Sequence, residues 1–312
     1  MRIRLGYVSI SRTIYNYIRL STITYTNYKN KEDSTSLDNI IIKNLNNLYE
    51  ILKYNINNNI HFYRISSNLI PLATKKEVYF DYLNKYKDYY HKISELIKNN
   101  NIRVDMHPGN FCVLNSTKKE VVESSIDIIK YHYDIMDKMG IKDKIIILHI
   151  GSSVLGKKNS ITRFINNFNK LDKKLKDSIV IENDDKVFTI EDCLYISDKL
   201  NIPVVLDYHH FKCNNTGINI EKYLDKIIDS WKDKTPKMHF SSPKSKREFR
   251  NHNEYINVDD FIEFINILSK YNKDIDIMLE AKAKDEALFR LVRELKYKSD
   301  YKFIDETSFE VV

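Results

Sequence analysis

The chain has few cysteines for its length. Only three of its 312 residues are cysteines, and Cys112, Cys193 and Cys213 lie far apart in the sequence. An odd number of widely spaced cysteines predicts neither a disulfide framework nor a Cys-x-x-Cys zinc site. We therefore expect three inert thiols that behave as small apolar side chains.

Glycine is also scarce, with six residues. Neither a G-x-G-x-x-G sequence nor a P-loop sequence occurs. Their absence argues against the common nucleotide-binding loops. No apolar run approaches the roughly 20 residues that a membrane helix requires. The polar start, Met1 to Tyr7, is unlike a signal peptide. We expect a cytoplasmic protein with no membrane partner.

Short apolar runs alternate with longer amphipathic stretches along the whole chain. The predicted strands are Ile3–Ser9, Ile60–Ser66, Ile102–Met106, Lys144–Ile150, Ser178–Ile181, Ile202–Leu206, Lys237–Phe240 and Ile275–Leu279. The predicted helices are Leu37–Asn55, Tyr82–Lys98, Glu120–Met139, Ser160–Leu175, Ile190–Leu200, Ile220–Trp231, Val258–Lys270 and Asp285–Leu295. Such alternation predicts a parallel sheet, and eight strands are the number that closes a barrel.

No linker or charge block divides the sequence, so we expect residues 1–312 to form one α/β domain, a (β/α)8 TIM barrel. The alternative is an open doubly wound sheet, which usually has fewer strands and a glycine-rich phosphate loop.

Ionisable side chains gather where the predicted strands end, which is the catalytic end of such a barrel. These residues are His107, His149, Glu182, Asp207, His210, His239 and Glu280. Imidazole and carboxylate groups are ligands of borderline and hard divalent metals. The number of ligands exceeds the needs of one tetrahedral ion, so we expect two or three ions. Such clusters hydrolyse phosphodiesters.

Several short segments resemble the UV damage endonuclease family, within the xylose-isomerase-like barrels that also include endonuclease IV. They occur in order over nearly the whole chain. The matching segments are Leu5–Tyr7, Phe62–Ser67, Leu69–Ala73, Met106–Gly109, Val121–Ser125, Leu148–Gly151, Ile181–Asp185, Leu206–His210, Pro236–His239 and Met278–Lys282.

The resemblance implies a DNA repair endonuclease that incises 5′ to cyclobutane dimers and 6-4 photoproducts, and often cuts at abasic sites. It implies that the seven strand-end residues bind the metal ions, with Mn²⁺ as the expected metal. Glu182, Lys237 and Glu280 would be the catalytic residues. Lys237 would lie beside the metals and contact the scissile phosphate or bridge metals, while Tyr7 would face the lesion at the barrel mouth.

The sequence departs from the family pattern at two places. Lys75 stands where the family usually has a metal-ligating histidine, and a charged ammonium has no lone pair to donate. We therefore expect weaker occupancy of one metal site. Asn110 and Phe111 stand where the family commonly has glutamine and an aromatic residue, and we expect this pair to form a wedge that probes the lesion.

Basic residues follow the second, fourth and seventh predicted strands, where they could track DNA phosphates. They are Lys75, Lys76, Lys157, Lys158, Lys244, Lys246, Arg247 and Arg250, and we add His252 as a DNA contact. The expected partner is damaged double-stranded DNA, bound by a monomer that associates with the nucleoid during repair. The rival functions are an abasic-site endonuclease, a metal-dependent sugar isomerase or epimerase, and a non-enzymatic DNA-binding module.

Overall fold

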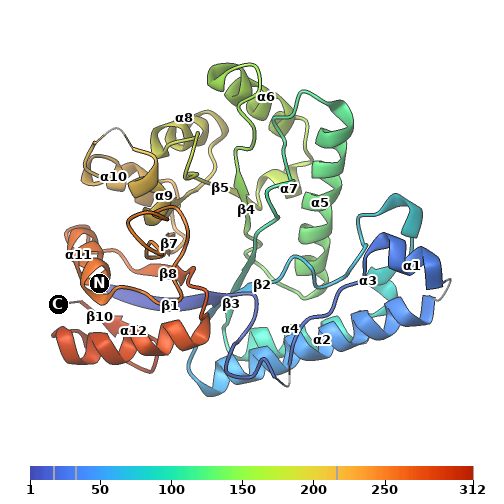
Figure 1. The fold of residues 1–312 in the computed structure, drawn as a ribbon, viewed down its shortest axis with the longest axis horizontal. Coiled ribbons are helices and arrows are strands. Elements are labelled where there is room, and N and C mark those ends of the chain that lie inside the picture. Colours follow the sequence, from blue (N-terminus) through green and yellow to red (C-terminus); the bar gives the residue numbers. More distant parts are fainter. Residues whose placement is uncertain (17, 32–33, 216, 312) are drawn as a thin grey trace.

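Eight parallel strands close into a barrel in the computed structural model, which describes residues 1–16, 18–31, 34–215 and 217–311 (Figure 1). Strand β1 pairs with both β8 and β2, and this pairing closes the sheet. The strands are β1 (Arg2–Val8), β2 (Phe62–Ile65), β3 (Arg103–Met106), β4 (Ile146–His149), β5 (Ile179–Glu182), β6 (Val204–Asp207), β7 (Lys237–Phe240) and β8 (Ile275–Leu279). The predicted TIM barrel is confirmed.

Helices surround the barrel, and the largest apolar core fills the space between them and the strands. They are α1 (Tyr25–Lys31), α2 (Ser34–Asn57), α3 (Tyr82–Lys85), α4 (Lys87–Asn99), α5 (Lys119–Lys138), α6 (Lys157–Asn169), α7 (Lys173–Lys176), α8 (Ile190–Leu200), α9 (Tyr208–Cys213), α10 (Glu221–Asp229), α11 (Val258–Ser269) and α12 (Asp285–Lys298), with a 3₁₀ turn at Lys76–Val78. Across the described ranges, no helix combines the length and apolar character that a membrane span requires.

Two predicted helices are each divided in the structure. The stretch predicted from Tyr82 to Lys98 breaks at Tyr86, whose ring is buried and whose hydroxyl donates to the Asp38 carboxylate over 2.5 Å. The stretch predicted from Ser160 to Leu175 becomes α6 and α7, with the buried side chain of Leu171 in the turn between them. In both cases a tertiary contact overrides helical periodicity.

A C-terminal hairpin, β9 (Lys302–Phe303) and β10 (Ser308–Glu310), is absent from the prediction. Strand β2 pairs only with Tyr7 and Val8 of β1, so the first half of β1 has a free edge there. Strand β10 pairs antiparallel with that half. This brings the chain ends together, and the Met1 amino group donates to the Val311 carbonyl over 3.3 Å.

Alternate residues of each strand face the barrel interior, as the two-residue period of a strand requires. Ile147 of β4, Val180 of β5 and Val205 of β6 pack there with Trp231 in a small buried cluster. The same interior face continues two residues further on, at the barrel mouth, with His149, Glu182 and Asp207. The apolar interior thus directs three predicted metal ligands toward a common point.

An ionic layer closes the opposite end of the barrel. The Asp276 carboxylate is fully buried on β8 and accepts two hydrogen bonds of 2.6 Å from the Arg4 guanidinium. It also accepts a 2.5 Å bond from Arg103 of β3. One carboxylate therefore joins three strands and neutralises charge that is costly to bury alone.

Replacing this carboxylate should destabilise the barrel strongly. In Asp276→Asn the two arginines lose a buried counter-charge, and we expect the free energy of unfolding to fall by roughly 3–5 kcal/mol. Urea denaturation measures the change. The control is Asp274→Asn, which weakens a half-exposed ion pair with Arg2 and should cost about 1 kcal/mol or less. Equal losses in the two variants would contradict the structural role of Asp276.

Candidate metal centre

All seven predicted metal ligands converge at the carboxyl ends of the strands. They form three groups, and within each group the potential ligand atoms lie within 4.8 Å of one another. The groups are His107, His149 and Glu182; Glu182, His239 and Glu280; and Glu182, Asp207 and His210. Glu182 belongs to every group, which makes its carboxylate the centre of the site.

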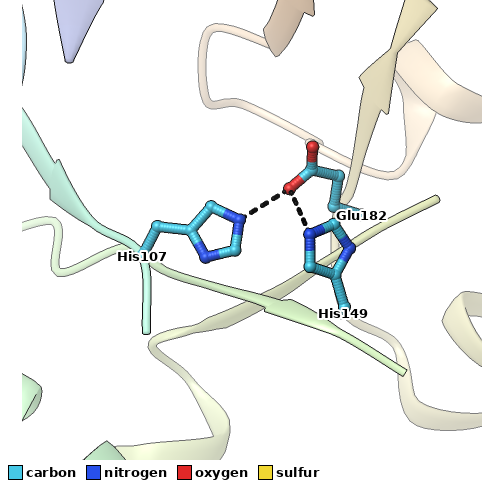
Figure 2. A group of neighbouring side chains, drawn as sticks. All are labelled: His107, His149 and Glu182. Carbon is cyan, nitrogen blue, oxygen red and sulfur yellow. Dashed lines mark hydrogen bonds and ion pairs between the residues drawn. The ribbon is translucent and has the colours of Figure 1, made fainter. Parts of the chain in front are cut away.

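The two oxygens of Glu182 face different histidines. Oε2 lies 2.9 Å from Nε2 of His107 and 3.7 Å from Nε2 of His149, the arrangement drawn in Figure 2. Oε1 lies 2.8 Å from Nδ1 of His239 and 3.6 Å from Nδ1 of His210. Glu182 could therefore offer one oxygen to each of two neighbouring groups of ligands.

Among the predicted ligands, two buried atoms have no hydrogen-bond partner among the described residues. They are Oδ2 of Asp207 and Nδ1 of His149, the ring nitrogen of His149 that is not turned toward Glu182. Buried polar atoms are usually satisfied, and an unsatisfied one costs free energy. The other Asp207 oxygen accepts a 2.7 Å bond from the His210 backbone at the start of α9, so the carboxylate orientation is already fixed. These features fit a divalent cation with imidazole and carboxylate ligands.

The buried carboxylates and imidazoles of the site interact strongly with one another. Burial acts to raise the pKa of Glu182, but the imidazoles of His239, His149 and His107 outweigh it and hold the pKa well below its usual range. Burial acts to lower the pKa of His210, but Asp207, Glu182 and Glu280 raise it to about 9. The Glu182 carboxylate thus remains ionised, and its negative charge attracts a proton to His210 or a cation to the site.

Lys237 lies inside the barrel, and its predicted contact with a scissile phosphate or with metal ions stays a prediction. Its side chain is fully buried in the barrel, and its ammonium donates to the Asp105 carboxylate. Burial lowers the pKa of Lys237 to about 7, while Asp105 acts in the opposite direction. Lys237 lies two residues before His239 on the same face of β7, which places it one layer below the ligands.

Arg64 and Asp105 connect that layer to the ligands, and the sequence analysis missed both. Arg64 donates to Asp105 over 3.0 Å, to Glu280 over 2.6 Å and to Nε2 of His239 over 2.6 Å. Arg64 therefore orients two predicted ligands from below. Asp105 could have been found because it precedes His107 by two residues and so shares its interior face. Arg64 is less easily found because β2 supplies no ligand.

The structure contradicts the prediction that Tyr7 faces the lesion at the barrel mouth. Tyr7 is fully buried, and its hydroxyl donates to Oδ1 of Asn55 on α2 over 2.8 Å. Arg4 and Val8 of β1 face the barrel interior, so Tyr7 faces the helices because side chains alternate along a strand. Its role in this structure is to attach β1 to α2.

Two adjoining cavities, of about 420 and 550 Å³, open at the barrel mouth. His149, His210, Asn110, Arg250 and His252 line both. Phe111, beside Asn110, has an exposed fraction of 71%. The predicted wedge residues therefore stand at the mouth and remain free to contact a ligand.

The remaining predicted DNA contacts differ in their surroundings. Arg250 pairs with Asp185 over 2.7 Å, and Nδ1 of His252 lies 2.8 Å from the Glu280 carbonyl oxygen. Lys75 lies 3.5 Å from Glu77 and over the Tyr25 ring, and it lines neither mouth cavity. The structure therefore does not place Lys75 in the position of a metal ligand.

The fold and site define a TIM barrel with clustered imidazole and carboxylate groups at the carboxyl ends of its strands that could hold metal ions. The sequence profile of the family described as UV-endonuclease UvdE matches residues 3–310. A protein of Bacillus cereus named UV DNA damage endonuclease is 40% identical over 301 residues, which cover 95% of each chain. A Bacillus anthracis protein of the same name is 38% identical, with the same coverage.

Solved structures agree with this assignment. The crystal structure of SacUVDE is 38% identical, has a TM-score of 0.87, and the match covers 95% of this chain and 98% of that one. Endonuclease IV from Thermus thermophilus has a TM-score of 0.60 with 9% identity, covering 95% of this chain and 100% of that one, and therefore shows the shared fold alone. The chain belongs to the UV-endonuclease UvdE family, which confirms the resemblance seen in its motifs.

Metal binding should stabilise the protein. Adding Mn²⁺ to metal-stripped protein should raise its Tm, since a ligand at 100 times its Kd contributes about 2.7 kcal/mol to the folded state. Glu182→Gln should lose most of this shift because Glu182 belongs to all three ligand groups. The control is His61→Gln, since His61 pairs with Asp305 outside the metal centre. Differential scanning fluorimetry measures the shifts, and a full shift in Glu182→Gln would exclude the proposed centre.

Proposed function

We propose that the protein is a metal-dependent DNA repair endonuclease that incises the damaged strand 5′ to UV photoproducts and also cuts at abasic sites. The observation that carries the proposal is the shared position of Glu182 in three adjacent ligand groups. We propose two or three bound ions, with Mn²⁺ as the working metal, because imidazole and carboxylate ligands suit such ions. Family membership supplies the substrate class.

Bound divalent ions would supply Lewis-acid stabilisation of the charge that develops on the phosphate oxygens. The chain's own residues hold the ligands in place for this chemistry. Arg64 fixes Glu280 and His239 through bonds of 2.6 Å each. The Asn183 side-chain oxygen accepts from the Asp207 backbone over 2.9 Å, which aligns the ends of β5 and β6. Such prior ordering lowers the reorganisation needed during catalysis.

Recognition of the lesion would use the loop after β3. Photodimers cannot be recognised by base sequence, and damaged bases cost less free energy to extrude from a duplex. Phe111 is exposed and can stack on an unpaired base, while Asn110 can hydrogen-bond the bases left opposite. Arg250 and His252 at the mouth, and Lys75 further out, would contact the flanking DNA.

The primary test is incision of a duplex that carries one cyclobutane dimer. Purified protein with Mn²⁺ should cut the damaged strand on the 5′ side, and EDTA should abolish cutting. Glu280→Gln should slow it by about a hundredfold or more, because the ions supply several kcal/mol and each 1.4 kcal/mol is tenfold in rate. Denaturing gels with end-labelled strands locate the cut.

A matched duplex with an abasic site separates the lesion classes, and an undamaged duplex is the negative control. Cutting of the abasic duplex alone would replace the proposal with an abasic-site endonuclease. Cutting of the dimer duplex at an unchanged rate in EDTA would contradict metal dependence. Wild-type rates in both Glu182→Gln and Glu280→Gln would show that the cluster is not catalytic.

The wedge residues should determine preference for damage. Phe111→Ala and Asn110→Ala should each weaken binding to the dimer duplex by about one to two orders of magnitude, the factor that roughly 1.4–2.7 kcal/mol implies. The Mn²⁺-induced rise in Tm should be unchanged. Tyr297→Ala on α12 is the control, since Tyr297 is an aromatic residue with an exposed fraction of 91%. An unaltered ratio of affinities for damaged and undamaged duplex would rule out the wedge.

A further inference from the structure

Lys284, between β8 and α12, has an unusual backbone conformation. Its φ is 55° and its ψ is −123°, values that favour glycine and strain a residue with a Cβ atom. Strained conformations persist only where the surrounding structure enforces them, and they cluster at functional sites. Two features of Lys284 therefore need an explanation: what holds its backbone in this conformation, and why the residue is a lysine.

The structural cause is a set of hydrogen bonds on both sides of the residue. The backbone N–H groups of Lys282 and Ala283 donate to the carbonyls of Asn253 and Glu254, over 3.0 Å each. On the other side, the fully buried Asp285 carboxylate accepts from the hydroxyls of Ser11 over 2.6 Å and Tyr54 over 2.9 Å. These bonds fix the chain before and after Lys284.

The side chain of Lys284 lines the 550 Å³ cavity at the barrel mouth, together with the predicted ligands His107, His149, His210 and Glu280. It is half-buried, and no hydrogen bond or ion pair joins its ammonium to any described residue. Burial lowers the pKa of this ammonium, against the opposing effect of Glu280. A partly desolvated cation without a partner favours the binding of an anion.

Ser9, which follows β1, likewise has a strained backbone and a side chain without a hydrogen-bond partner among the described residues. Its φ is 65°, it lines the same cavity, and its hydroxyl makes no hydrogen bond to a described residue. Its backbone is held by a 3.0 Å bond from its N–H to the Arg64 carbonyl and by a 2.7 Å bond from the Tyr63 hydroxyl to its own carbonyl. Hydrogen bonds thus hold two strained residues, one with an ammonium group and one with a hydroxyl group, in the lining of the same cavity.

We propose that Lys284 and Ser9 form a phosphate-binding subsite, beside the metal centre, for a backbone phosphate of the damaged strand. The inference rests on the proposed endonuclease function and adds a substrate contact on the β8–β1 side of the mouth. Asn110 and Arg250 reach the same cavity from the loops after other strands. Glycine would adopt this backbone without strain, so the presence of a lysine calls for a role of its side chain.

The test uses Lys284→Gly and Lys284→Arg in the Mn²⁺-loaded protein. The probe is a dimer duplex with phosphorothioate linkages 5′ to the lesion, which slow cutting and retain the negative charge. The matched control is Lys232→Gly, because Lys232 is an exposed lysine with a φ of 54° between α10 and β7, at the opposite end of the barrel. Binding is measured over a series of salt concentrations.

In Lys284→Gly we expect affinity to fall about tenfold, as for loss of a charged hydrogen bond. The slope of log affinity against log salt should decrease in magnitude by about 0.9, the value for one phosphate contact in duplex DNA. The Tm should stay at or above that of wild type because glycine relieves the strain. Lys284→Arg should retain the slope, and Lys232→Gly should bind as wild type does.

An unchanged slope in Lys284→Gly, with wild-type protein active on the dimer duplex, would overturn the subsite. Equal slope changes in Lys284→Gly and Lys232→Gly would also overturn it, since the effect would then be one of general charge. Failure of the wild type to cut the dimer duplex would instead contradict the proposed function. The two hypotheses therefore fail by different measurements.

Discussion

The metal centre depends on the placement of one carboxylate, that of Glu182, among four imidazoles. Its two oxygens lie 2.8 and 2.9 Å from the nearest ring nitrogens, on His239 and His107. Burial of a carboxylate is unfavourable unless charge and hydrogen bonds compensate. The strands that supply these histidines must therefore stay in register around β5, and the closed barrel holds them in that register.

The polar groups below the centre serve the same requirement. Lys237, Asp105 and Arg64 form a buried chain that ends at Glu280 and His239. Removing one member would leave an uncompensated charge in the interior, so the chain couples barrel stability to ligand orientation. The mouth differs from this interior, because Phe111 is exposed there.

Much of the fold could be predicted because periodicity is a local property. Helix α8 (Ile190–Leu200) has the predicted bounds, and the predicted strands overlap the observed ones. The hairpin β9–β10 could not be predicted in this way, since it forms against the free edge of β1, some 300 residues away in the sequence. The break at Tyr86 likewise depends on its contact with Asp38.

The pattern of apolar runs was enough to identify which residues end the strands, and thereby the seven ligand candidates that the structure brings together. It did not determine which face each strand residue takes. Tyr7 and Lys237 matched family motifs, yet Tyr7 faces α2 and Lys237 lies below the ligands. These positions depend on the assembled barrel, because a one-residue step reverses the side-chain direction and a two-residue step changes the layer of the barrel.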